Sequence, residues 1–293
     1  MWRPGTTICI CPNPPAASWR SSSAGWRGEG RGRGPGRVRT VRGRRGRAEV
    51  TEPGTATDEA GRTALLCVPF AGAGPSFFHP WRALAADRWR IVTVELPGRE
   101  RRILETPYRN VVEAAKSSVD DIVTELGQGT RTVLFGHSLG AVLAYELVHL
   151  LSARDVPVER LVVSGSPGPW TQRERRATGL RDEEFLARVE EFAGFRHEAL
   201  DHPEMRELIL PVLQADCEMH ENYVPSTDRP VSVPICSLRG DSDGLVSADQ
   251  AQEWRNATTG AFTSAEFPGD HMYLVDRARE VLDVIAAQST GRP

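Results

Sequence analysis

The feature that most constrains the fold of this chain is a Gly-x-Ser-x-Gly pentapeptide at residues 136–140, together with its flanks. A short apolar run at 132–135 precedes the pentapeptide, and apolar residues at helical spacing follow it. Glycines on both sides of a serine let neighbouring backbone come close, so that the serine can occupy a sharp turn between a strand and a helix. The pattern therefore predicts a buried strand, an exposed nucleophile at Ser138 and a covering helix in direct succession.

Short apolar runs and amphipathic stretches alternate along the chain from about residue 63. The expected strands are 64–70, 90–96, 132–135, 161–164, 235–238 and 261–267. The expected helices are 110–126, 139–151, 182–192, 203–223, 248–256 and 278–287. This alternation is typical of a mostly parallel sheet covered by helices on both faces. With the serine turn, it predicts an α/β-hydrolase fold, and the interval 167–234, which lacks a convincing strand, is expected to form a helical lid.

The first 61 residues differ in composition from the remainder of the chain. They are rich in Gly, Arg, Pro and Ser, and the Arg-Gly block at 28–47 has almost no apolar side chains. Such a segment cannot offset the entropy lost on ordering, so we expect a disordered extension at 1–61 and a single hydrolase domain at 62–290. A misplaced start codon is one alternative. A nucleic-acid-binding arm is another, although the block lacks aromatic residues for stacking, and we expect no nucleic-acid partner.

The cysteines and the hydropathy of the chain indicate the cellular compartment in which it works. The five cysteines show neither the spacing of a disulfide framework nor that of a zinc site. No apolar run reaches the roughly 18 residues needed to span a bilayer, and the N-terminus lacks the apolar core of a secretory signal. We therefore expect a cytoplasmic protein with no metal and no membrane contact.

A serine nucleophile needs a base, because its hydroxyl is barely ionised at neutral pH and histidine can accept the proton. In this fold the acid and then the base follow the serine along the chain. Among seven histidines, His271 is the one that follows the last expected strand, at the sheet edge where α/β proteins bind ligands. Asp241 and Asp243 both follow the strand 235–238; we choose Asp243, because its loop has more room to turn, and keep Asp241 as an alternative.

Acyl transfer also needs backbone donors for the oxyanion of the tetrahedral intermediate. The residue after the nucleophile supplies one, which is the N–H of Leu139. The second is expected from the glycine-containing loop at 69–74 after the first strand, through the N–H of Phe70 or Ala71. The alternative is that these glycines simply form a tight turn.

Further motifs resemble those of the type II thioesterases of polyketide and nonribosomal peptide biosynthesis, over residues 64–287. The features that carry the resemblance are Pro-Phe-Ala-Gly at 69–72 followed by Trp81, Leu-Pro-Gly-Arg-Glu-Arg-Arg at 96–102, and Pro-Val-Leu-Gln-Ala-Asp at 211–216 with Tyr223. The resemblance implies an α/β-hydrolase that hydrolyses acyl thioesters on the phosphopantetheine arm of carrier proteins. It implies no cofactor of its own, since the substrate carries the phosphopantetheine.

The resemblance also assigns roles to residues. It implies that Ser138 is the nucleophile, Asp243 the acid and His271 the base. Two positions depart from the family pattern, with Phe70 where the family often has His or Tyr, and Asp270 where it usually has Gly. The first departure concerns the pocket rather than the backbone donor, and the second concerns the loop that carries the base.

The cluster of Arg99, Arg101 and Arg102 is the candidate surface for a partner. A basic cluster attracts an acidic carrier domain or the phosphate of its arm, which predicts a monomeric enzyme that acts in trans on acyl or peptidyl carrier domains. The alternative is a solvated basic loop. For the whole chain, a general carboxylester hydrolase and an inactive carrier-binding scaffold are the two competing hypotheses.

Overall fold

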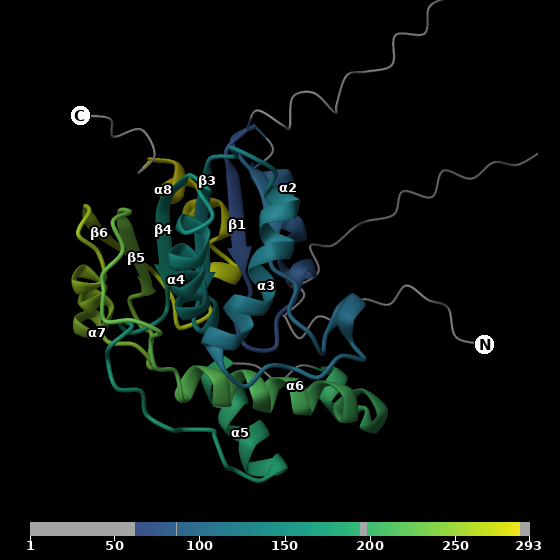
Figure 1. Ribbon diagram of the computed structural model, residues 1–293. Helices are drawn as coiled ribbons and strands as arrows, with labels where there is room; N and C mark the ends of the chain where they lie inside the picture. The colour runs from purple at the N-terminus through teal and green to yellow at the C-terminus, as the bar shows by residue number, and fades with distance from the viewer. Residues whose placement is uncertain (1–61, 86, 194–197, 288–293) are drawn as a thin grey trace, which may run out of the picture.

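The computed structural model describes residues 62–85, 87–193 and 198–287, and it places a six-stranded sheet at their centre (Figure 1). The strands run in the order β2-β1-β3-β4-β5-β6, and every pair is parallel. Their bounds are β1 Ala64–Val68, β2 Arg90–Thr93, β3 Thr132–His137, β4 Val158–Ser164, β5 Ile235–Gly240 and β6 Phe262–Phe267. The expected α/β-hydrolase fold is confirmed, and the expectation for residues 1–61 lies outside the described residues.

Helices cover both faces of this sheet, which explains why β1 and β3 are buried along their whole length. The helices of the sheet domain are α2 His79–Ala85, α3 Val111–Leu126, α4 Leu139–Ser152, α7 Ala248–Gln252 and α8 Ala278–Ala287. Short 3₁₀ turns are η1 Pro75–Phe78, η2 Glu100–Arg102, η4 Glu253–Ala257 and η5 Tyr273–Val275. One core cluster joins α3 and α4 to the sheet, and a second joins α2 and α8 to its other face.

Two helices and a short turn separate β4 from β5 and form the expected lid. They are α5 Asp182–Ala193, η3 Glu198–Asp201 and α6 Pro203–Glu221. Figure 1 shows α5 and α6 beyond the end of the sheet toward which the arrow of β1 points, which is the carboxyl edge. The lid has an apolar cluster of its own, which includes Phe185, Leu186, Leu200, Ile209 and Leu213. It therefore covers the edge at which the loops after β1, β3, β4, β5 and β6 converge.

The structure departs from the sequence prediction mainly at the ends of elements. The first two strands end at Val68 and Thr93, short of the predicted 70 and 96, although Val94 and Leu96 remain buried. Apolar residues that pack beneath a loop continue the hydrophobic run of the strand, so the run alone does not mark where the strand ends. Helix α2 was not predicted, because its seven residues are too few to show a period.

Residue Asn110 illustrates a boundary that the sequence did predict. Its side chain accepts a hydrogen bond from the N–H of Glu113 at 3.0 Å, which is an N-cap for α3.

Among the described residues, no helix is both long and apolar enough to cross a membrane.

Candidate active site

Ser138 occupies the turn between β3 and α4 with a left-handed backbone, at φ +52°. Both flanking glycines are required by close approach of backbone. A side chain at Gly136 would collide with the carbonyl of Gly140, and one at Gly140 would collide with the carbonyl of Val68. The N–H of Ser138 donates to the carbonyl of Ser164 at 2.8 Å, which ties the turn to the end of β4. The pentapeptide therefore builds a tight, strained turn that presents Ser138 at the carboxyl edge.

His271 and Asp243 form a buried pair behind this serine. The Nδ1 atom of His271 lies 2.9 Å from Oδ2 of Asp243, and the other carboxylate oxygen accepts the N–H groups of Leu245 at 2.8 Å and Val246 at 3.1 Å. Burial opposes ionisation of Asp243, but these hydrogen bonds and the charge of the imidazole outweigh it and hold the pKa of the carboxyl below its ordinary value. An ionised Asp243 accepts a hydrogen bond from Nδ1–H of His271 and leaves Nε2 as the basic nitrogen.

Asp241, the alternative acid, lies in the same loop but points elsewhere. Its carboxylate accepts the N–H of Gly269 at 3.1 Å and the hydroxyl of Ser242 at 2.9 Å. The backbone hydrogen bond from Gly269, followed by the one from the Ser242 hydroxyl, lowers the pKa of Asp241. Asp241 thus fastens the loop after β5 to the loop that carries His271, while Asp243 contacts the imidazole itself.

A second histidine lies against His271. The ring of His137 is 4.8 Å from that of His271, centroid to centroid, and its Nδ1 is 2.8 Å from Oγ of Ser164. The same hydroxyl lies 2.7 Å from the phenol oxygen of Tyr273. Burial, and then the charge of His271, lowers the pKa of His137 well below its usual value, so it remains a neutral packing partner. Sequence reasoning set His137 aside as a base and did not foresee its contact with His271; the motif gave no signal for it.

The loop after β1 faces the start of α4 across the same site. The N–H of Ala73 donates to the carbonyl of Phe70 at 3.0 Å, and Gly72 has φ +75°. In the part of the chain that the structure describes, the N–H groups of Ala71 and Leu139 have no acceptor within the protein. The tight contact between Gly140 and the carbonyls of Val68 and Pro69 brings the start of α4 against the loop that follows β1. The arrangement suits an anion that forms next to Ser138.

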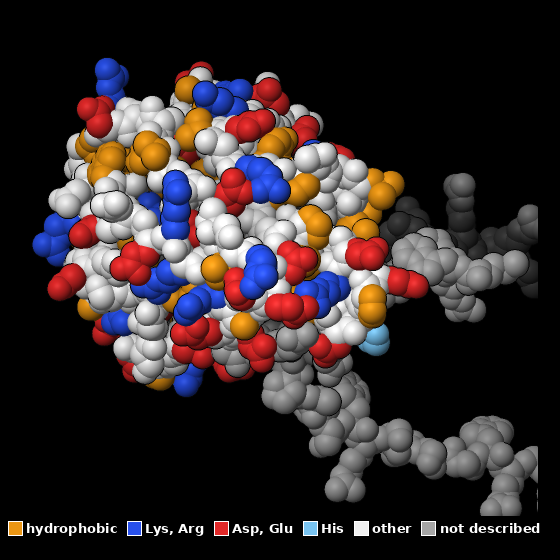
Figure 2. Space-filling model, turned by 90° about the horizontal axis from the view of Figure 1, so that it is seen from below, with side chains coloured by type: hydrophobic (Ala, Val, Ile, Leu, Met, Phe, Trp, Pro, Cys, Tyr) orange, Lys and Arg blue, Asp and Glu red, His pale blue; other side chains and the backbone are white. Residues whose placement is uncertain are grey.

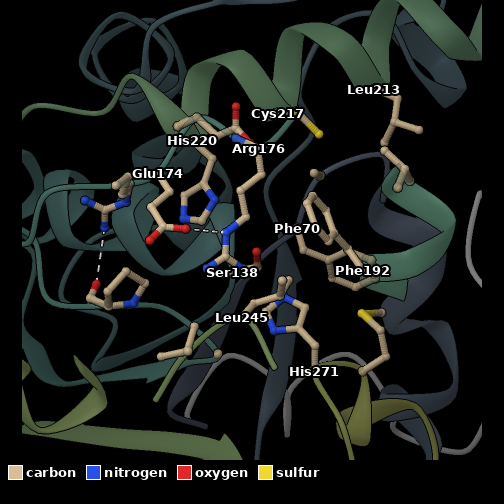
Figure 3. A pocket seen from close by; sticks show the side chains of 18 of the residues that line it. Phe70, Ser138, Glu174, Arg176, Phe192, Leu213, Cys217, His220, Leu245 and His271 are labelled. Carbon is tan, nitrogen blue, oxygen red and sulfur yellow. Dashed lines mark hydrogen bonds and ion pairs between the residues drawn. The ribbon is translucent and has the colours of Figure 1, made fainter. Parts of the chain in front are cut away.

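A cavity of about 220 Å³ extends from Ser138 and His271 beneath the lid (Figure 3). Its apolar wall comes mostly from the lid, with Leu186, Val189, Phe192, Leu200 and Leu213, and from Phe70 and Met272 of the sheet domain. Phe70 and Ala71, whose N–H groups were predicted as oxyanion donors, line the same cavity as Ser138 and His271. The cavity can therefore hold an apolar group attached to an atom that reacts at Ser138.

One wall of the cavity is polar and was not predicted. It includes the Glu174–Arg176 ion pair, 2.9 Å between Nε and the carboxylate, and His220 of α6 (Figure 3). Burial, and then the charge of Arg173, keeps the pKa of His220 well below its ordinary value. The thiol of Cys217 also lines the cavity, but burial raises its pKa, so it is no competing nucleophile.

The three arginines proposed as a partner surface do not form one exposed cluster. Arg99 is buried, with its guanidinium in a two-bond ion pair with Asp216, which corrects the expectation that it faces solvent. Arg101 is 85% exposed and pairs with Glu95, whereas Arg102 is 28% exposed and pairs with Glu105. The lid face shows acidic and basic side chains mixed together rather than a patch of one sign (Figure 2).

In residues 62–85, 87–193 and 198–287 there is no group of three His, Cys, Asp or Glu side chains placed to hold a metal ion.

Comparisons with known proteins identify the family. Residues 63–289 match the family model of the thioesterase domain. The thioesterase PikA5 of Streptomyces venezuelae is 32% identical over 223 residues, which cover 76% of this chain and 79% of PikA5. The gramicidin S biosynthesis protein GrsT of Aneurinibacillus migulanus is 29% identical over 236 residues, 79% of this chain and 90% of GrsT. A probable cadicidin biosynthesis thioesterase of Streptomyces griseus is 32% identical, and the match covers 63% of its length.

Solved structures of type II thioesterases also resemble this chain. The type II thioesterase BorB from the borrelidin biosynthetic cluster superposes with a TM-score of 0.69 at 32% identity, over 77% of this chain and 92% of BorB. YbtT, a type II thioesterase from the yersiniabactin pathway, superposes with a TM-score of 0.71 at 29% identity, over 78% of this chain and 93% of YbtT.

Proposed function

The chain belongs to the thioesterase domain family as a type II thioesterase of polyketide and nonribosomal peptide pathways, and we propose that Ser138, His271 and Asp243 carry out its hydrolysis. The observation that supports these roles is the buried contact of 2.9 Å between His271 and Asp243, beside the cavity that Ser138 lines. A neutral imidazole oriented by an ionised carboxylate is the base that a serine nucleophile requires.

In this proposal the reaction runs through an acyl-enzyme. Nε2 of His271 accepts the proton of Ser138 as Oγ attacks the thioester carbonyl, and the tetrahedral intermediate collapses with loss of the thiol, which takes the proton from the imidazolium. A water molecule then attacks the ester on Ser138, with His271 again accepting and returning a proton. The free acid leaves, and Ser138 is regenerated. Asp243 stays ionised throughout and stabilises the imidazolium in both steps.

The backbone donors act on the charge that forms during both attacks. We assign these donors to the N–H groups of Leu139 and Ala71, and Leu139 is the first residue of α4, where the helix dipole favours a negative charge. Phe70 forms the wall next to these donors and contacts the ring of His137 at 5.6 Å between centroids. Its aromatic ring therefore shapes the pocket, while the donors come from the backbone.

A type II thioesterase acts on acyl groups bound to carrier proteins. We assign the acyl group to the cavity under the lid, because its wall is largely apolar and it opens beside Ser138. The finer proposal is that the enzyme works in trans, in the cytoplasm, on carrier domains of separate assembly-line proteins. Arg101 is the exposed arginine that remains as a candidate carrier contact, with Arg102 partly exposed beside it.

The test is acyl release from a phosphopantetheinylated carrier protein, measured beside release from a small oxygen ester of the same acyl group, with wild type and Ser138→Ala. We expect faster release from the carrier, and loss of that release in the variant. Faster cleavage of the oxygen ester would assign the protein to the carboxylester hydrolases. Carrier binding without turnover of either substrate would support an inactive scaffold.

A further inference from the structure

A buried ion pair connects the lid to the loop that carries the second oxyanion donor. Asp216 lies on α6, and its Oδ2 accepts the N–H of Gly72 at 2.8 Å. Arg99 donates to both oxygens of this carboxylate, at 2.8 and 2.9 Å, and to the carbonyl of Ala73 at 2.9 Å. The Asp216 side chain is completely buried, and that of Arg99 is 6% exposed. The pair thus binds two consecutive residues of one loop, through the N–H of Gly72 and the carbonyl of Ala73.

The loop it holds is a tight turn with a required shape. The hydrogen bond from Ala73 to Phe70 closes the turn, and Gly72 has φ +75° at its third position while Ala71 before it keeps a negative φ. This is the pattern of a type II turn. The peptide between Ala71 and Gly72 is flipped relative to its orientation in a type I turn. In the observed orientation the N–H of Gly72 points at Asp216, so the carboxylate selects the orientation of the peptide next to Ala71.

Stability alone is a weak reason for this arrangement. Two buried charges lose hydration, and apolar residues of similar size often replace such a pair with little loss of stability. An apolar pair, however, offers no acceptor to Gly72. From the placement of this acceptor we propose that Asp216 is a positioning residue for the thioesterase reaction, which holds the Phe70–Ala73 turn so that Ala71 faces the oxyanion. The inference rests on the proposed roles of Ser138 and Ala71.

The position of Asp216 on α6 also links the donor to the acyl cavity. Leu213, Cys217 and His220 lie on the same helix and line the cavity. The loop before Arg99 packs against this helix, since a side chain at Gly98 would come within 2.9 Å of Val212. One helix therefore carries both part of the cavity wall and the carboxylate that binds the N–H of Gly72. A displacement of α6 would move both together.

The experiment compares two double variants that differ only in the acceptor. Both carry Arg99→Met, so neither has the ion pair or the donor to Ala73. The first adds Asp216→Asn, which keeps an oxygen for the N–H of Gly72; the second adds Asp216→Leu, which keeps the branched shape and removes the oxygen. Glu218→Gln is the matched control, because Glu218 lies on α6 and pairs with Arg109 away from the loop.

Three quantities are measured for each folded variant: kcat and KM for carrier-bound substrate, affinity for an alkylboronic acid that forms a tetrahedral adduct on serine, and affinity for an unreactive thioether analogue. For the Asp216→Leu double variant we expect kcat and boronic acid affinity to be about tenfold to a hundredfold below those of the Asp216→Asn double variant, with KM and thioether affinity alike. The Glu218→Gln control should match wild type.

Equal kcat and equal boronic acid affinity in the two double variants would overturn the positioning role, and so would equal losses of boronic acid and thioether affinity. Failure of the proposed function is a separate outcome, since it appears in wild type itself as hydrolysis that Ser138→Ala leaves intact. Circular dichroism and thermal unfolding establish that both double variants are folded. If only the Asp216→Leu variant failed to fold, the brace would be structural and the inference would be wrong.

Discussion

Gly165 is the position at which one added carbon should test the geometry of the site. It follows β4 with φ +53°, and a Cβ there would lie 2.6 Å from Cε1 of His137 and 3.1 Å from Cε1 of His271. For Gly165→Ala, the left-handed backbone costs about 1–2 kcal/mol. Carbon atoms pack at roughly 3.5–4.0 Å, so the His137 ring must also move by about 1 Å. Its hydrogen bond to Ser164 and its contact with His271 oppose that shift.

The displaced ring of His137 should move His271, which it contacts, and so slow the reaction. A misplacement of about 1 Å costs about a hundredfold in rate, so we expect kcat for acyl release to fall about a hundredfold, or about 2.7 kcal/mol of activation free energy. Gly129→Ala is the control, because Gly129 has φ +68° with nothing within 4 Å of its Cβ position. It should lose only the backbone cost, a Tm shift of about 2–4 °C per kcal/mol, and keep wild-type kcat. Equal kcat in the two variants would refute the reasoning.

Three further predictions concern Asp243 and Tyr223. Asp243→Asn should lower kcat about 10⁴-fold, because the amide no longer selects the Nδ1–H form of His271; steady-state acyl release measures this, and an unchanged kcat would exclude Asp243 as the orienting acid. Because its folded pKa is lowered, Asp243 stabilises the protein fully above the ordinary pKa near about 3.9, and that contribution is lost as pH falls through the lower folded pKa. Urea unfolding from pH 6 to pH 2 should thus show a smaller loss in Asp243→Asn than in wild type, and parallel curves would contradict this. Tyr223→Phe removes the hydroxyl that donates to buried Glu146 at 2.7 Å and should lower the unfolding free energy by about 1.5–3 kcal/mol with kcat retained, which urea titration and the same assay would check.

The order of elements was predictable because burial on both faces leaves a continuous apolar signal in parallel strands. The fully buried strands β1 and β3 carry that signal most strongly. Strand ends and short helices were less predictable, since the same apolar residues continue into loops that the core also buries. Helix α2 shows the limit, because Trp81 and Ala85 are buried within a segment too short for a period.

The candidate site divides in the same way between local and long-range information. The predictions of Ser138 as the nucleophile and His271 as the base relied on the serine turn and on the order of residues along the chain. The choice between Asp243 and Asp241 depended on side-chain direction within one loop, and the structure places only Asp243 against the imidazole. Arg99 was misread because its neighbours in sequence are basic, whereas its partner Asp216 lies 117 residues away on the lid. The sequence around Arg99 has the composition of an exposed loop, although the Arg99 side chain itself is buried. The ion pair with Asp216 becomes visible only in the folded protein. It distinguishes a residue that holds a loop in place from one that binds a partner protein.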